Sequence, residues 1–329
     1  MVDLLDDVGW SRLFHAMGPA HDTPRHLAAL LGGDDRALVD GYSHLWSTTL
    51  RPEGKVWPAT APTALLVVEL LNHLLSASDD PSLPDAMLAY LYAVGVAADL
   101  GDRAAEIRAR VEDRAQELQA WTDDYLSADA DDRSRMWQDG TGLGELVLDQ
   151  ATLACFDLMP ALLRQTLPHL ASERVARRTC AAAAVAALAR HPSASAQRPV
   201  LLERFASMAR ASESPYELAT LLVAMGHLGG DTRFWLSHPN AGVRGCAALA
   251  PGLAGHDTAE RVLLRLAQTP RAFSQSFGDM APPLQFQFEP YQGLLRKWSV
   301  SDAPAGTLSG GSRAEPYRTA AAVTVPWKT

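Results

Sequence analysis

The chain has 329 residues, of which 47% are hydrophobic and 20% are charged. This length and balance are typical of a soluble globular protein that buries a large core. The formal net charge of −9 disfavours a general binder of nucleic acids or of anionic membranes, because both of these surfaces are themselves negative.

The three cysteines stand far apart, each inside an apolar run that predicts a helix: Cys155, Cys180 and Cys246. An odd and scattered set is typical of buried small side chains in a reducing compartment, rather than of disulfides or a metal site. The first residues are too acidic for a signal peptide, and no apolar run is long enough to span a bilayer. We therefore expect a cytoplasmic protein without a membrane partner.

The first fifty residues predict helices. A helical stripe is expected within residues 3 to 20, from the spacing of four side chains: Trp10, Leu13, Phe14 and Met17. Thr23 is the expected cap of a short helix with Pro24 at its first position, where a missing N–H costs nothing. A further helix is expected from Asp34 and Asp35 to about residue 49, which completes a first helical pair.

The middle of the chain predicts longer helices. After a proline-rich loop at 51–62, helices are expected at three ranges: 61–77, 82–100 and 102–125. The acidic stretch 123–132 lacks the glycine and distal glutamate of a calcium loop, so it is expected to be a solvated connector. The glycines of 140–144 have no strand before them and no lysine after them, so phosphate binding is not expected. The next helix should run to residue 163, with a break near Pro160.

Capping signals place the helices of the second half. Ser172 is expected to cap a helix over 173–190, and Asn240 one within 238–250. Ser214 with Glu217, and Asp257 with Glu260, form capping boxes. A loop at 192–197 is expected to separate the helix over 173–190 from one over 200–211, and a short helix is expected at 234–236. Four phenylalanines are expected to cover the last repeat: Phe273, Phe277, Phe286 and Phe288. Beyond them we expect a final turn at 294–298 and a flexible stretch at 301–316, while 317–327 could form a strand or stay disordered.

Small side chains line the helix within 238–250, where Val243, Cys246, Ala247 and Ala250 share one face. Such a face allows close approach of a neighbouring helix but cannot be buried by one helix alone. This predicts an all-α fold in which helical hairpins stack as an α-solenoid over residues 1–300, with an irregular C-terminal cap and a tail at 301–329. Val39, Val175 and Val243 occupy similar helix positions, at successive offsets of 136 and 68 along the chain, but three positions are too few to establish a period.

The residues Val243-Arg244, Cys246-Ala247 and Ala250, after His238-Pro239, resemble a bacterial HEAT repeat of the type also called PBS-lyase HEAT-like. His238 and Pro251 depart from that pattern, in which aspartate and leucine are usual. Looser copies lie at residues 172–188 and 34–46. The segment 1–75 also resembles uncharacterised actinobacterial HEAT-repeat proteins, through Trp10, His15-Ala16, Gly18, Ala20, Asp22, Pro24, Gly54 and Ala59-Thr60-Ala61.

This resemblance implies a right-handed superhelix of helical hairpins and specifies no activity. The wider family spans scaffolds, chromophore-protein lyases and DNA glycosylases of related build.

Few residues suggest chemistry. The ten histidines show no metal-ligand spacing, and although His21, His26 and His44 are near in sequence, neither a metal nor another cofactor is expected. No Gly-x-Ser-x-Gly elbow is present, and no cysteine has the polar, basic surroundings of a reactive thiolate.

Two residue sets are candidate binding sites. Residues 164–210 hold eight arginines against Glu173 and Glu203, and the candidates of this kind are Arg174, Arg177, Arg178 and Arg244. We expect the arginines of this stretch to pair with the acidic segments of 102–132 and with solvent; the alternative is an anion-binding ridge for an acidic partner or a phosphorylated ligand. The aromatic candidates fit either interface anchors or core packing, which is the commoner role at helical spacing: Tyr42, Trp46, Trp57 and Trp235.

The leading hypothesis is a non-catalytic scaffold, in an accessory or immunity-type role, whose groove binds another protein or peptide, with an acidic partner as one option. The alternative is an enzyme that uses the groove as its active site, such as a HEAT-like DNA glycosylase or a biosynthetic tailoring enzyme. The acidic net charge disfavours the glycosylase, because phosphate contacts dominate the affinity for DNA. Nucleic acid is therefore not the expected partner.

Overall fold

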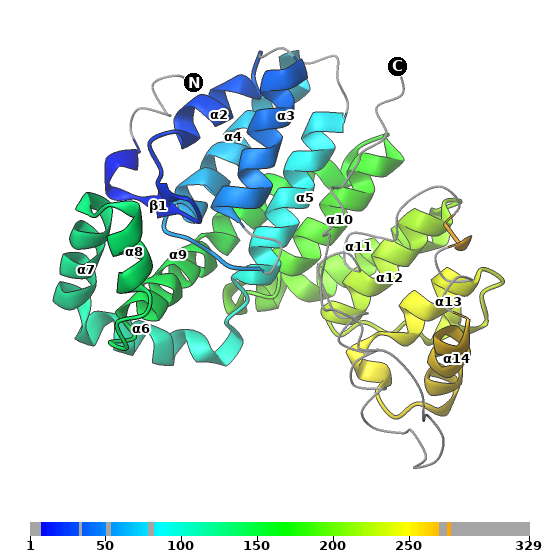
Figure 1. Ribbon diagram of the computed structural model, residues 1–329. Coiled ribbons are helices and arrows are strands. Elements are labelled where there is room, and N and C mark those ends of the chain that lie inside the picture. The colour runs from blue at the N-terminus through cyan, green and yellow to red at the C-terminus, as the bar shows by residue number, and fades with distance from the viewer. Residues whose placement is uncertain (1–7, 33–34, 51–53, 78–81, 270–274, 278–329) are drawn as a thin grey trace, which may run out of the picture. The chain divides into compact units, whose positions relative to one another are not determined.

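The computed structural model describes residues 8–32, 35–50, 54–77, 82–269 and 275–277. The chain divides into two compact units, 1–290 and 291–329, and all described residues belong to the first. These residues are predominantly helical, which confirms the expected all-α class (Figure 1). Most of the predicted C-terminal cap and all of the predicted tail lie outside the described residues.

The N-terminal region differs from the predicted helix over residues 3–20. Its elements are η1 (Trp10–Arg12), β1 (Phe14–His15), β2 (Gly18–Pro19), α2 (Thr23–Ala29), α3 (Asp35–His44) and the π-helical turn η2 (Leu45–Thr49). In the hairpin, Phe14 pairs with Pro19 and His15 with Gly18. Gly18 has a φ of 119°, a conformation that side chains disfavour, so the glycine ends any helix here. The hairpin buries Phe14 completely.

The central region contains the longest helices. They are α4 (Thr60–Ala77), α5 (Ser82–Ala97), η3 (Gly101–Arg103), α6 (Ala104–Asp113), α7 (Ala115–Ser127), α8 (Ala130–Met136), α9 (Leu143–Thr166) and η4 (Leu167–Ala171). The helix predicted over 102–125 is interrupted at Arg114. The predicted connector 123–132 is largely helical, because Asp129 accepts a hydrogen bond from the Asp132 amide at 2.9 Å and so caps α8.

Pro160 does not break α9 as predicted, since the helix continues past it to Thr166. A proline inside a helix costs about 3 kcal/mol, and the buried side chains of Met159, Leu162 and Leu163 around it offset that cost. The stretch Leu143–Ala171 is long and apolar enough to cross a membrane. This is weak evidence for a span, because more than half of its apolar window is buried in the protein, as in core helices that pass the same test.

The second half contains α10 (Val175–Leu188), η5 (Pro192–Gln197), α11 (Arg198–Ala211), α12 (Pro215–His227), η6 (Arg233–Ser237), α13 (Ala241–Ala248), η7 (Pro251–Leu253) and α14 (Asp257–Gln268). The predicted cap at Asn240 is confirmed, since its side chain accepts from the Val243 amide at 3.0 Å. Ser214 likewise accepts from the Glu217 amide at 3.3 Å. The prediction that Asp257 caps its helix is wrong. Asp257 is the first residue of α14, and His256 before it makes no side-chain capping bond.

Four helices of the chain pack in a continuous row: α5 packs against α10, α10 against α12, and α12 against α13 (Figure 1). Three helices of this row each have a further helix packed beside them: α4 packs against α5, α11 against α12, and α14 against α13. Small residues allow the close approach within the row. A Cβ added to Gly95 would lie 3.1 Å from Ala187 Cβ, and one on Gly226 would lie 2.9 Å from Ala250. Residues 181–189 are all buried.

Part of the segment predicted to cover the last repeat is described, at residues 275–277. Phe277 is buried and its ring lies edge-on to Tyr216, with centroids 6.2 Å apart. Ser276 accepts from the Gly242 amide at 3.0 Å and from the Asn240 side chain at 2.8 Å. These contacts attach Ser276 to the start of α13 and Phe277 to α12.

Candidate functional site

The predicted arginine ridge is engaged in ion pairs within the chain. Arg177 Nε lies 3.1 Å from Asp85 Oδ1 on α5, and Arg174 Nη2 lies 3.7 Å from Asp85 Oδ2. Arg178 binds Glu217 of α12 through two hydrogen bonds, of 2.8 and 3.2 Å. The expectation that these arginines pair with residues 102–132 is therefore wrong, because α10 packs between α5 and α12 and faces their carboxylates instead.

Arg244, the fourth predicted arginine, binds backbone rather than an anion. Its Nη1 donates to the carbonyls of His238 at 2.6 Å and Pro239 at 2.8 Å. Arg174 keeps 47% of its side chain exposed, whereas Arg177 and Arg178 keep 12% and 25%. Of the three arginines on the predicted ridge, Arg174 is thus the one best placed to meet another molecule.

The predicted aromatic residues lie in different environments. Trp57 is buried and belongs to an aromatic cluster defined by Phe14, Trp57, Trp121, Tyr125 and Trp137, within which Phe14 contacts every other ring at centroid distances of 4.4 to 6.5 Å. Trp235 is buried as well, beside the largely exposed Phe234. Tyr42 and Trp46 are partly exposed, and Trp46 lies edge-on to the buried Tyr90.

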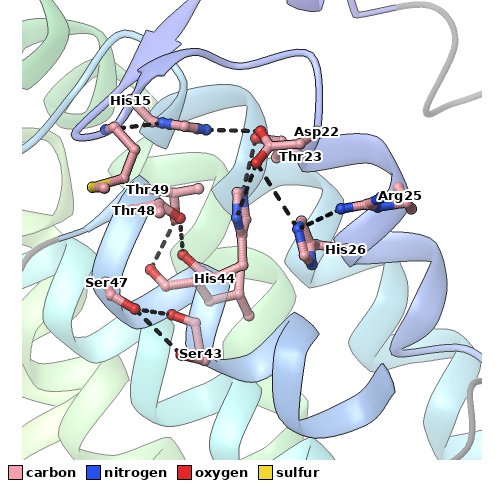
Figure 2. Close-up of polar contacts among 12 residues, drawn as sticks. His15, Asp22, Thr23, Arg25, His26, Ser43, His44, Ser47, Thr48 and Thr49 are labelled. Atoms are coloured by element: carbon pink, nitrogen blue, oxygen red, sulfur yellow. Dashed lines mark hydrogen bonds and ion pairs between the residues drawn. The ribbon is translucent and has the colours of Figure 1, made fainter. Parts of the chain in front are cut away.

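A polar cluster that the sequence analysis did not assemble lies beside the N-terminal hairpin (Figure 2). We call it the histidine cluster, defined by His15, Asp22, His26 and His44. His15 Nε2 lies 2.8 Å from Asp22 Oδ1, while His44 Nδ1 and His26 Nε2 each lie 3.9 Å from Asp22 Oδ2. His15, Asp22 and His44 each offer one ligand atom, and these atoms lie within 4.8 Å of one another.

Local structure brings these side chains together. The hairpin carries His15, Asp22 immediately precedes α2, and His44 ends α3 where the π-helical turn η2 begins. Gly41 permits the close approach of α2 and α3, because a Cβ there would lie 2.6 Å from the His26 carbonyl oxygen. As a result, the rings of His26 and His44 stack at 4.3 Å with an interplanar angle of 12°. π-helical turns are frequent at functional sites.

Each buried histidine is held through its second ring nitrogen. His44 Nε2 lies 2.9 Å from the hydroxyl of Thr23, and the Met17 amide donates to His15 Nδ1 at 3.2 Å. His15 and His44 are only 2% and 5% exposed, whereas 44% of the Asp22 side chain is exposed. The cluster therefore has a buried imidazole side and a solvent-facing carboxylate side.

The electrostatics favour a neutral imidazole beside an ionised carboxylate. Burial lowers the pKa of His44 to about 4, although Asp22 opposes this shift. Burial raises the pKa of the Asp22 carboxyl. The hydrogen bond from His15 and the electrostatic attraction of His15 and His44 outweigh burial, so the pKa of the carboxyl is lowered. Neutral histidine and ionised aspartate are the forms that bind metal ions.

Nucleophilic chemistry has little support among the described residues. Thr23, His44 and Asp22 have the residue types of a catalytic triad, but Thr23 is completely buried and beyond the reach of a substrate. Burial raises the pKa of the thiols of Cys155 and Cys180 to about 12, so these cysteines are not reactive thiolates.

Two members of the cluster, His26 and His44, were considered as metal ligands from the sequence, whereas His15 and Asp22 were not. His21, the third histidine considered with them, belongs to none of the cluster contacts described above. A signal for the missing pair was present, because His15 and Asp22 are among the residues that carry the N-terminal resemblance to HEAT-repeat proteins. Comparisons with protein-family models, curated proteins and solved structures found no match for this chain.

Proposed function

We propose that the chain is a HEAT-like helical-repeat scaffold that binds another protein or peptide. The observation that carries this proposal is a structural repeat between α10 and α13. These helices start at Val175 and Ala241, an offset of 66 along the chain, and both pack against α12. Repeated helical units stacked on their neighbours are the architecture of solenoid scaffolds.

The repeat extends to single hydrogen bonds. Arg178 Nη1 donates to the carbonyls of Ser172 and Glu173, both at 2.9 Å. Arg244 makes the equivalent bonds to residues 238 and 239, again six and five positions earlier in the chain. The same offset of 66 pairs Cys180 with Cys246 and three alanines with alanines: 181 with 247, 182 with 248 and 184 with 250. This agreement between contacts and sequence supports two copies of one unit.

The exposed aromatic on this part of the chain is a candidate anchor for the partner. Phe234 in η6 is 79% exposed, while the adjacent Trp235 is buried. Covering a large exposed apolar side chain with a partner removes it from water and so favours binding, and aromatic residues are common anchors at protein interfaces. We therefore assign the anchor role, for which Trp235 was one candidate, to its neighbour Phe234.

Co-purification from the native host, followed by titration of the purified partner against the full chain, tests this proposal. We expect Phe234→Ala to weaken direct binding about tenfold or more, the scale of an interface hot spot. Val39→Ala is the matched control, because Val39 is also exposed but lies on α3 in the N-terminal region; it should bind as the wild type does. Failure to find a protein or peptide that binds the purified chain directly would contradict the scaffold role, and equal binding by Phe234→Ala would contradict the anchor.

A further inference from the structure

We propose that His15, Asp22 and His44 bind a divalent transition-metal ion of the zinc type, independently of the scaffold role. The donors are two imidazole nitrogens and one carboxylate oxygen, a set that suits zinc and its neighbours in the transition series. The three side chains lie outside α5, α10, α12 and α13. The site would therefore be a separate property of the N-terminal region.

The three ligand atoms are near enough to one another to share such an ion, since they lie within 4.8 Å of one another. Zinc lies about 2.0–2.2 Å from nitrogen and oxygen ligands, so tetrahedral neighbours stand about 3.4 Å apart. His15 Nε2 lies 2.8 Å from Asp22 Oδ1 and His44 Nδ1 lies 3.9 Å from Asp22 Oδ2, so the two distances fall on either side of that value. Small rotations of the three side chains would bring one oxygen and both nitrogens onto a shared ion.

The protonation of His44 is already suited to a ligand. Its Nδ1 faces Asp22, while its Nε2 lies beside the Thr23 hydroxyl, which can accept the ring proton. A second-shell bond of this kind fixes the tautomer and the ring orientation of a metal-binding histidine. Thr23 is buried, so its hydroxyl does not depend on solvent for its position.

His15 must change its tautomer to bind the ion. The Met17 amide donates to His15 Nδ1, so in the absence of metal the ring proton lies on Nε2 and is donated to Asp22. Coordination through Nε2 releases that hydrogen bond and places the proton on Nδ1, where it conflicts with the Met17 N–H. Met17 lies in the turn of the hairpin and its side chain is 74% exposed, so a local adjustment at Met17 need not displace a buried side chain. Metal binding should thus change the environment of the Met17 amide.

Solvent completes the coordination. Three protein ligands leave one tetrahedral position open, and the exposed side of Asp22 gives water access to it. His26 is the alternative fourth ligand, but its ring lies flat against His44 and its Nε2 already accepts a hydrogen bond from Arg25 Nη2 at 3.4 Å. We assign the fourth position to water.

Titration of the metal-free full chain with Zn²⁺, followed by calorimetry, tests the site, with Co²⁺ as a spectroscopic substitute. We expect one ion per chain, visible absorption from tetrahedral Co²⁺, and a shift of the Met17 amide resonance. Asp22→Asn and His15→Ala should each weaken binding at least tenfold. His21→Ala is the matched control because His21 is exposed and adjacent to Asp22, and His26→Ala should also bind as the wild type does.

Because His44 is buried, His44→Gln is compared only if its thermal unfolding remains cooperative; Asp22→Asn decides the question otherwise. The proposal is overturned if Zn²⁺ binds Asp22→Asn as tightly as the wild type, or if His21→Ala loses binding to the same extent. It is also overturned if the Met17 resonance does not respond to one equivalent of Zn²⁺. None of these outcomes depends on whether a protein partner binds at Phe234.

Discussion

Arg178 and Arg244 occupy equivalent positions in α10 and α13, and each donates the same pair of hydrogen bonds to backbone carbonyls just before its own helix. They differ in one respect. Arg178 also binds Glu217, whose side chain is only 4% exposed, and Glu217 in turn accepts from the Ser212 hydroxyl at 2.7 Å. One arginine therefore joins its own helix to α12, whereas the described bonds of the other stay within its own repeat.

This difference predicts unequal effects of removing the two arginines. Arg178→Ala should lower the free energy of unfolding by about 3 kcal/mol or more, because it leaves the buried Glu217 carboxylate without its charge partner. Arg244→Ala removes hydrogen bonds to two carbonyls and should cost about 1–2 kcal/mol. Urea unfolding of both variants measures the difference. Adding Glu217→Gln to Arg178→Ala should recover part of the loss; equal costs for the two arginines would contradict the prediction.

The contact between α12 and Ala250, two residues after the end of α13, predicts a second effect. Gly226→Ala would place a Cβ 2.9 Å from both Cα and Cβ of Ala250, so the two segments must move apart. We expect a cost of about 1–3 kcal/mol, as for other overpacked cores. Gly252→Ala is the control, since a Cβ there meets no atom within 4 Å, and it should change stability by about 0.5 kcal/mol at most. Similar melting temperatures for the two variants would contradict the close packing.

Helix starts could be predicted where neighbouring residues decide them. Ser214 and Asn240 cap their helices as the sequence indicated, because the side chain and the amide it binds are three residues apart. Even so, only half of the predicted Ser214 box forms. The Glu217 side chain binds Arg178 and Ser212 instead of the Ser214 amide.

Features that depend on distant residues could not be predicted in this way. Phe14 was assigned to a helix, but its position is set by packing against Trp121, Tyr125 and Trp137, more than a hundred residues later. The histidine cluster was missed for the same reason, since His15 reaches Asp22 only through that hairpin.

The repeat register shows the same limit. The sequence aligned Val175 with Val243 at a spacing of 68, yet Val175 is 41% exposed and Val243 is completely buried. The arginine hydrogen bonds give 66 instead, because contacts with the preceding loop, rather than residue type alone, define equivalent positions.

Burial of Trp57 predicts a large packing effect. Trp57→Ala should cost about 3–5 kcal/mol and reduce the near-ultraviolet circular dichroism, because it leaves a cavity in the aromatic cluster around Phe14. Trp46→Ala should cost less, since Trp46 is partly exposed. Chemical unfolding monitored by far-ultraviolet circular dichroism measures both. If Trp57→Ala were as stable as Trp46→Ala and instead lost partner binding, Trp57 would be an interface anchor.

His227 predicts how stability depends on pH. Burial, with a smaller contribution from nearby Arg190, lowers the pKa of His227 from its ordinary 6.5 to about 4, against the attraction of Asp99, which forms an ion pair with Arg190. The unfolded chain therefore takes up a proton at a higher pH than the folded chain does. The stabilising contribution of neutral His227 is present above pH 6.5 and is lost as the pH falls toward 4, and it amounts to about 3 kcal/mol.

His227→Gln removes this titration. Between pH 7 and pH 4 the free energy of unfolding of this variant should fall less steeply than that of the wild type, by up to about 3 kcal/mol over the range. His73→Gln, on an exposed position of α4, is the control and should follow the wild-type curve. Urea unfolding at half-unit steps of pH measures the three curves. If His227→Gln loses stability on acidification as steeply as the wild type, other groups govern the acid response, because the proton taken up by unfolded His227 would then contribute nothing.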